Sequence, residues 1–68
     1  MLRNNLYTGH VVDASMVLAT SEEQEIWTTY DSIDMAISDA TLIVGKYDHI
    51  ECSIFDKDRN RLHLIQPS

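Results

Sequence analysis

The shortness of the chain limits its fold more than any other feature of the sequence. Its 68 residues suffice for one small domain, residues 1–68, and a domain of this size buries only about 60% of the surface that its unfolded chain exposes. Small domains gain further stability from disulfides, a bound metal or a second subunit. The only cysteine, Cys52, cannot form a disulfide within the chain. We therefore expect the protein to form a homo-oligomer.

Residues 31–44, DSIDMAISDATLIV, have the clearest secondary-structure pattern. Asp31 is a favourable helix N-cap, Asp34 follows it three residues later, and Gly45 is suited to end a helix in a left-handed turn. The apolar residues recur at helical spacing and predict a helix with one apolar face. That face consists of Ile33, Ala36, Ile37, Ala40 and Val44.

Residues 50–55, IECSIF, and residues 61–66, RLHLIQ, are expected to form two strands joined by a polar turn. Apolar side chains alternate in each segment, so each strand has one apolar face. These faces consist of Ile50, Cys52 and Ile54 in the first strand and of Leu62 and Leu64 in the second.

The part of the chain before the helix has two interpretations. In the first, residues 11–20 and 25–30 form two strands, because apolar residues alternate in the former and the latter is rich in aromatic and β-branched residues. In the second, residues 21–44 form one long helix, because apolar residues follow a 4-3-4 spacing from Ile26 to Val44. Weak helix formers in the middle of this segment favour the first interpretation; they are Thr28, Thr29, Asp31 and Ser32.

Both interpretations give an α+β fold, a small antiparallel sheet of three or four strands with one helix packed on one face. The first has the order ββαββ. The alternative, with the long helix over residues 21–44, has the order βαββ.

The segment FDKDRNRLHL contains the start of a calcium-loop pattern, with Asp56, Asp58 and Asn60 at alternate positions. An EF-hand loop also needs Gly at its sixth position and Glu at its twelfth, where this chain has Arg61 and Pro67. The segment is therefore interpreted as a charged hairpin turn. His49 and Cys52 are too few ligands for zinc, and we expect neither metal nor cofactor.

The sequence gives no support for catalysis. Cys52 lies in a predicted buried strand, which favours an inert thiol. The combination of Ser53, His63 and Asp56 is of a kind that many short chains contain by chance. The two glycines lie far apart, so there is no glycine-rich phosphate loop. We expect a protein that is not an enzyme.

The charge distribution is strongly uneven. The net charge is −6, and residues 4–45 contain no Lys or Arg. A negative field repels nucleic-acid phosphates and anionic lipids and attracts basic surfaces. The basic side chains of Lys57, Arg59 and Arg61 are interleaved with acids, so we do not expect direct nucleic-acid binding. The acids of residues 4–45 are Asp13, Glu22, Glu23, Glu25, Asp31, Asp34 and Asp39.

Nothing in the sequence predicts a membrane location. The first residues, MLRNNLY, lack the apolar segment of a signal peptide. No apolar run approaches the roughly 20 residues that a membrane span needs. We expect a cytoplasmic protein.

The outer face of the predicted helix gives the best candidate binding surface. Met35 and Leu42 lie seven residues apart, opposite the apolar face, and are flanked by acids. We expect a small acidic binding protein, an inhibitor or modulator such as phages and other mobile elements encode, that engages a basic partner protein. The predicted partner-binding residues are Glu22, Glu23, Glu25, Asp31, Asp34, Met35, Asp39 and Leu42.

The alternative function is structural. In that case the chain is a homo-oligomeric assembly protein, its acidity serves only solubility, and either Met35 and Leu42 or an edge strand forms the contact between subunits.

Overall fold

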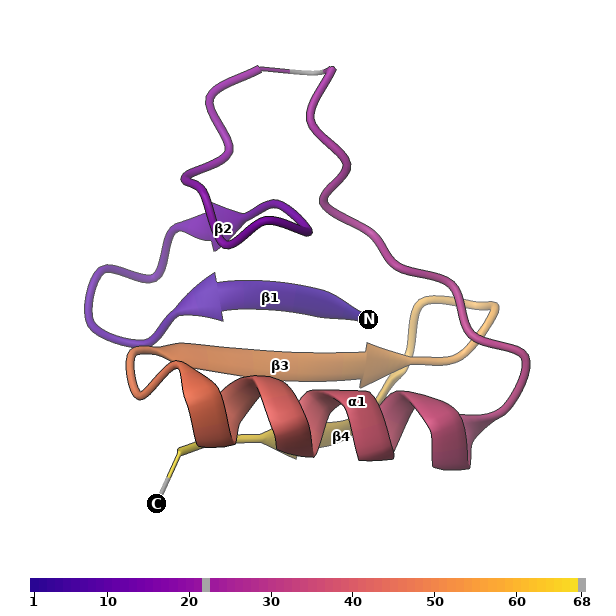
Figure 1. Cartoon of the computed structure of the whole chain (residues 1–68). Coiled ribbons are helices and arrows are strands. Elements are labelled where there is room, and N and C mark those ends of the chain that lie inside the picture. The colour runs from indigo at the N-terminus through magenta and orange to yellow at the C-terminus, as the bar shows by residue number, and fades with distance from the viewer. Residues whose placement is uncertain (22, 68) are drawn as a thin grey trace.

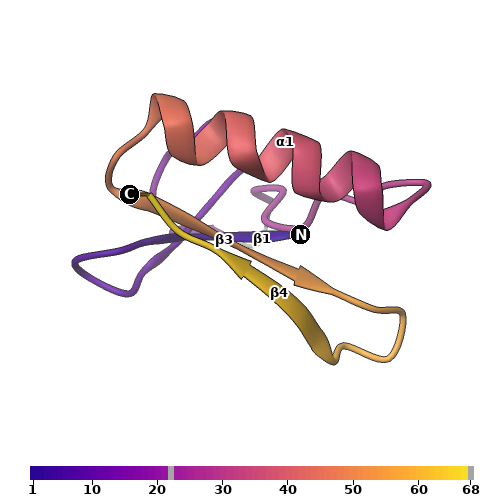
Figure 2. The same cartoon turned by 90° about the horizontal axis from the view of Figure 1, so that it is seen from below.

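In the part of the chain that the structure describes, one helix lies on one face of a four-stranded antiparallel sheet (Figure 1). The computed structural model describes residues 1–21 and 23–67. The strands lie side by side in the order β2-β1-β3-β4, and Figure 2 shows the helix and the strands as two layers. The predicted α+β architecture and the order ββαββ are confirmed, and the long helix over residues 21–44 is wrong. The elements are β1 (Leu2–Asn5), β2 (Val11–Val12), α1 (Ile33–Lys46), β3 (Ile50–Phe55) and β4 (Arg61–Ile65).

The two strands before the helix differ from the prediction in position. β1 was not predicted, and only Val11–Val12 of the expected strand 11–20 is a strand. Residues 25–30 form no strand, although Trp27 makes one isolated bridge to Leu2.

Side-chain hydrogen bonds to the backbone explain why the chain after β2 is a loop rather than a strand. The Asp13 carboxylate accepts hydrogen bonds from the backbone N–H groups of Ser15 and Val17, at 2.8 and 3.1 Å. The Gln24 side chain accepts one from the Thr20 N–H at 2.6 Å and donates one to Asp13 at 2.9 Å. Such local bonds compete with a strand ladder for the same backbone groups.

The helix α1 starts two residues later than predicted. Its N-cap is Ser32, whose hydroxyl accepts a hydrogen bond from the Met35 N–H at 3.2 Å, so the expected cap at Asp31 is wrong. Gly45 lies inside the helix and does not end it in a left-handed turn.

The core lies between the inner face of α1 and the sheet. The predicted apolar face of β3 is confirmed, since Ile50, Cys52 and Ile54 are at most 2% exposed. On the helix, Ala36 and Ala40 are the buried residues, and their small side chains allow the helix to lie close to β3. Ile33, expected in this face, is 41% exposed. The remaining buried apolar residues of the core are Met1 and Val12. Partly buried side chains pack against this core; they are Met16, Tyr30, Ile37, Ile43, Val44, Tyr47 and Ile65.

Arg3 connects β1 to the long loop that precedes the helix. Although charged, it is only 2% exposed. Its guanidinium donates to the backbone oxygen of Asp13 at 3.3 Å, to the backbone oxygen of Ile26 at 3.2 Å and to the hydroxyl of Thr28 at 2.7 Å. A buried guanidinium needs such acceptors to offset the loss of water. Arg3 therefore holds both ends of the loop against the sheet.

The predicted hairpin of β3 and β4 is confirmed, but Leu62 and Leu64 do not share a face. The pairing passes from Ile54 opposite His63 to Phe55 opposite Arg61, which leaves Leu62 in a bulge. Leu62 lines a cleft beside α1, whereas Leu64 lies opposite Ser53 on the far side of the sheet.

Asp56 stabilises the turn of this hairpin. Its carboxylate accepts hydrogen bonds from the backbone N–H groups of Asp58 and Asn60, at 2.8 and 2.9 Å, and from the Asn60 side-chain amide at 3.3 Å. The segment that begins like a calcium loop is thus folded as a hydrogen-bonded turn.

These hydrogen bonds predict a pH dependence of stability. The hydrogen bonds hold the pKa of Asp56 below its ordinary value. The bond from the Asn60 backbone N–H has the largest effect, and the bonds from the Asn60 side chain and the Asp58 N–H have smaller effects. The stabilisation is therefore fully present above that ordinary value and is lost as the pH falls through the lowered pKa. We expect Asp56→Ala to lower Tm at pH 7, and the difference from the natural chain to shrink as the pH falls below 3.8. Thermal melts at stepped pH test this, with Asp58→Ala as the control; a difference that does not change with pH would contradict it.

Candidate functional site

The outer face of α1 carries two exposed apolar side chains. Met35 is 53% exposed and Leu42 is 70% exposed. Seven residues make about two helical turns, so both side chains lie along one line of the helix. The sequence prediction placed them opposite the apolar face, and their exposure agrees with it.

A shallow groove of about 460 Å³ runs along this line. It brings together four of the predicted residues, Asp34, Met35, Asp39 and Leu42, on consecutive turns of α1. We call it the acidic groove. Its complete lining is Tyr30, Asp34, Met35, Ser38, Asp39 and Leu42.

Tyr30 forms the side of the acidic groove that does not come from the helix. Its hydroxyl donates a short hydrogen bond to the Asp39 carboxylate. Burial first, and then this bond, raise the pKa of Tyr30 above its ordinary value, so the phenol stays protonated and remains the donor. One oxygen of Asp39 is therefore occupied and this residue is half-buried, whereas Asp34 is the exposed acid of the groove.

The sequence prediction missed Tyr30 because it assigned this residue to a strand. Its hydrogen bond spans nine residues, which is not a helical spacing, and only the turn into α1 brings the two residues together. No local pattern in the sequence could have identified this contact.

The other predicted residues lie outside the acidic groove. Asp31 is exposed and lines a different cleft. Glu23 and Glu25 are exposed on the loop before the helix. Glu22 lies outside the described residues.

The acidic side chains of the described residues are not neutralised by ion pairs with Lys or Arg. Their one pair within ion-pair distance joins Asp48 to His49, at 3.5 Å. The negative charge around α1 is thus available to a partner, and its field extends about 8–10 Å at physiological ionic strength.

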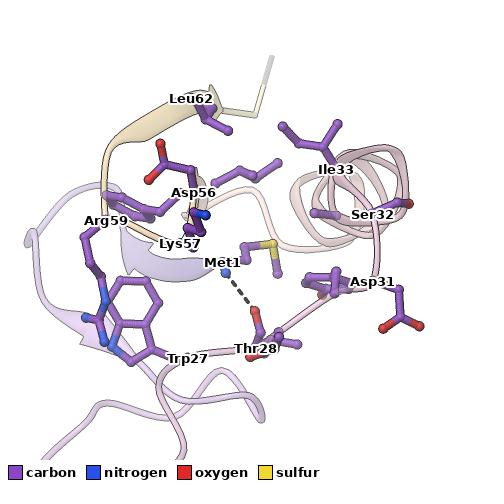
Figure 3. A pocket seen from close by; sticks show the side chains of 15 residues that line it. Met1, Trp27, Thr28, Asp31, Ser32, Ile33, Asp56, Lys57, Arg59 and Leu62 are labelled. Carbon is purple, nitrogen blue, oxygen red and sulfur yellow. Dashed lines mark hydrogen bonds between the residues drawn. The ribbon is translucent and has the colours of Figure 1, made fainter.

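A second cleft, also of about 460 Å³, opens where β1 begins (Figure 3). One wall is the segment that leads into α1, from Trp27 to Ser32, and the other is the end of β3 and the start of the β3–β4 turn, residues 55–57. Arg59 stacks on the Trp27 ring at 4.3 Å, and Phe55 meets the same ring edge-on at 5.3 Å. We call it the Trp27 cleft.

The sequence contained only weak signals of the Trp27 cleft. Trp27 is the one tryptophan of the chain, and Lys57 and Arg59 were recognised as a basic turn. The contact between Trp27 and Arg59 joins residues 32 positions apart, so periodicity could not predict it.

Cys52 is predicted to be chemically inert in the folded protein. Its side chain is fully buried. The pKa of the thiol is raised to about 11, and burial is the main cause. Because the thiolate is the reactive species, we expect a thiol reagent at pH 8 to label the native protein no faster than it unfolds. Labelling of Cys52 in the native protein as fast as in the protein unfolded by urea would contradict this expectation.

The described residues contain no cluster of three or more His, Cys, Asp or Glu side chains arranged to hold a metal ion. Within residues 1–21 and 23–67, the helix is too short and too polar to span a membrane. A scan of protein-family models, a search of curated proteins and a search of solved structures find no match to this chain.

Proposed function

We propose that this chain is a non-enzymatic, acidic binding protein that engages a basic partner protein through the acidic groove. The observation that carries the proposal is the exposure of Met35 and Leu42 in a groove that also contains Asp34 and Asp39. A few well-packed side chains near the centre of an interface supply most of its energy. Surrounding charges of one sign select partners of the opposite sign.

The energies of such an interface are consistent with a specific but modest affinity. Burying the exposed parts of Met35 and Leu42 is worth about 1–2 kcal/mol each. The acids add a faster, salt-dependent association with a positively charged surface. The partner surface that fits is a basic one with apolar side chains between Lys or Arg residues.

The biological role that we propose is that of an inhibitor or modulator, of the kind that phages and other mobile elements encode. Small size, a net charge of −6 and the absence of a catalytic motif support this role.

Capture from a bacterial lysate tests the proposal. The tagged protein is incubated with the lysate and washed at low and then at high salt. We expect a basic protein to be retained at low salt and released at high salt, because screening shortens the range of the acidic field. Retention of the protein alone, or of partners that high salt does not release, would contradict the proposal.

Self-association remains the second candidate, and the edge strand β4 favours it. Leu64 is 41% exposed, and β4, Arg61–Ile65, contains no acid. Two copies can meet there without bringing acids together, whereas contact between two acidic grooves would oppose Asp34 to Asp34. A monomer in sedimentation equilibrium at high micromolar concentration would contradict this candidate.

A further inference from the structure

The face of the sheet that points away from α1 carries basic and apolar side chains. Ile54 of β3 is buried in the core under the helix, so its neighbours Ser53 and Phe55 lie on the opposite face. Residues that pair directly in neighbouring strands share a face, and Leu64 of β4 pairs with Ser53. Arg61 pairs with Phe55, so Arg61 and Leu64 both lie on the face away from α1, where both are exposed.

Trp27 and Arg59 extend this surface. Trp27 forms a bridge to Leu2, which also pairs with Ser53, so Trp27 lies on the same face. Arg59 stacks on the Trp27 ring at 4.3 Å, and Figure 3 shows both side chains away from Ile33 at the start of α1. We call this surface the basic sheet face; it consists of Trp27, Phe55, Arg59, Arg61 and Leu64.

The two sides of the molecule carry charges of opposite sign. Residues 31–39, at the acidic groove, contain three acids and no base, whereas residues 56–61 contain three bases and two acids. The strand β4 that follows contains no acid. Glu51 lies on the same face of the sheet but at the other end of β3, where it accepts a hydrogen bond from Gln66 at 2.8 Å. The end of the sheet that carries Arg59 and Arg61 is therefore basic.

The basic sheet face has the chemistry that the acidic groove selects, with matching spacing. Along α1, Asp34 lies eight residues, about 12 Å, from Leu42. Along β4, Arg61 lies three residues, no more than about 10 Å, from Leu64. The long, flexible side chain of an arginine covers the difference. Arg61 of one copy can thus reach Asp34 of another while Leu64 contacts Leu42.

These two surfaces can meet only between different copies of the chain. The acidic groove lies on the outer side of α1 and the basic sheet face on the far side of the strands, so the two layers separate them within one copy (Figure 2). Contact between two grooves would oppose acids, and contact between two basic sheet faces would oppose Arg61 to Arg61. Only the contact of a groove with a basic sheet face brings opposite charges together.

We propose that the acidic groove of one copy binds the basic sheet face of a second copy, head to tail. This inference rests on the proposed function of the groove and gives it a partner, a second copy of this chain. Asp34 accepts hydrogen bonds from Arg61 of the second copy, and Met35 and Leu42 cover Leu64. Such a contact leaves one groove and one basic sheet face free, so further copies can join. A basic partner protein competes for the same groove and releases the copies from one another.

Two variants, each with one altered surface, test the head-to-tail contact by sedimentation equilibrium at high micromolar concentration and low salt. The groove variant combines Asp34→Lys with Leu42→Ser, and the face variant combines Arg61→Glu with Leu64→Ser. We expect the average mass of the natural chain to rise above twice the 7.8 kDa of one copy and to return to one copy at high salt. Each variant alone should remain a monomer.

An equimolar mixture of the two variants gives the decisive result. The natural groove of the face variant can bind the natural basic sheet face of the groove variant, and no further copy can join. We expect the mixture to form dimers and nothing larger. A mixture that stays monomeric, or a natural chain that stays monomeric, would overturn the proposal. Self-association of the groove variant alone would also overturn it, because its natural β4 edge would then be sufficient.

A matched control and a map of the contact complete this test. Asp48→Lys with Tyr7→Ser changes exposed residues outside both surfaces, and this control should assemble like the natural chain. In the mixture, an isotope-labelled face variant should show NMR amide shifts at Asp34, Met35 and Leu42. Shifts confined to residues outside the groove would overturn the proposed contact.

The lysate capture separates this inference from the proposed function. The face variant keeps the acidic groove, so it should retain a basic partner protein as well as the natural chain does. If it retains such a partner but the mixture forms no dimer, the head-to-tail contact is overturned and the proposed function stands. If the mixture forms dimers but no basic partner is captured, the head-to-tail contact is supported and the proposed function fails.

Discussion

Arg3→Met is expected to lower the free energy of unfolding by about 3 kcal/mol. The substitution preserves most of the apolar stem but removes the donors to Asp13, Ile26 and Thr28. Leaving a buried acceptor without a donor costs about 1–3 kcal/mol, and partial access of water to these acceptors reduces the sum. A domain of this length has about 3–10 kcal/mol of stability in total, so this one substitution removes a large part of it.

Urea unfolding followed by circular dichroism measures this effect. Arg3→Lys is the informative companion variant, because it retains the charge but lacks the planar fork that reaches acceptors in several directions. We expect it to be almost as unstable as Arg3→Met. Arg61→Met, at an exposed arginine on β4, is the control and should unfold close to the natural chain. A stable Arg3→Lys protein would contradict the role given to the guanidinium geometry.

Ile50→Ala is expected to lower the free energy of unfolding by about 3–4 kcal/mol. Ile50 is 0% exposed at the start of β3, in the same core as Ala36 and Ala40. Removing buried methylene groups loses their transfer energy and leaves a cavity. The helix is already in close contact with the sheet through the two alanines, so it has little freedom to close that cavity.

The conservative variant Ile50→Val gives the matched control. It removes one methylene and should cost about 0.5–1.5 kcal/mol. Urea unfolding of both variants measures the two losses of unfolding free energy. The slope of the unfolding free energy against urea concentration should remain unchanged if the folded state keeps its compactness. Equal stability of Ile50→Ala and the natural chain would contradict the position of the core.

The second half of the fold could be predicted because its pattern is apolar and periodic. Burial of Ile50, Cys52 and Ile54 on one face of β3, and of Ala36 and Ala40 four residues apart on α1, follows directly from strand and helix geometry, whereas burial of Ser53 on the other face of β3 does not. The limits of α1 were less accurate, because Ser32 and Asp31 are both good N-caps and only the Ser32 hydroxyl reaches the free N–H of Met35.

The first half could not be predicted in the same way because polar contacts determine it. β1, LRNN, has two Asn residues, which are depleted in strands, and its buried residue is Arg3. The loop after β2 is set by the side chains of Asp13 and Gln24. Alternation of apolar residues, the signal used for residues 11–20, carries no information about such bonds.

The candidate sites also contain features that follow from sequence periodicity and features that depend on tertiary contacts. Helical periodicity placed Met35 and Leu42 opposite the apolar face, but their exposure depended on which interpretation of residues 21–44 was right, and only the structure shows it. The contribution of Tyr30 to the acidic groove, and the whole Trp27 cleft, depend on how the segment before α1 passes beside Met1. That path depends on tertiary contacts between residues more than 20 positions apart.

The central claim, that the acidic groove binds a basic partner, is tested most directly by paired variants in the lysate capture. The groove variant combines Asp34→Lys with Leu42→Ser. The control combines Asp48→Lys with Leu64→Ser, which makes the same changes at exposed residues outside the groove. Both should unfold close to the natural chain. We expect the groove variant to lose the salt-sensitive basic partner at least tenfold and the control to retain it; equal retention by the two variants would contradict the claim.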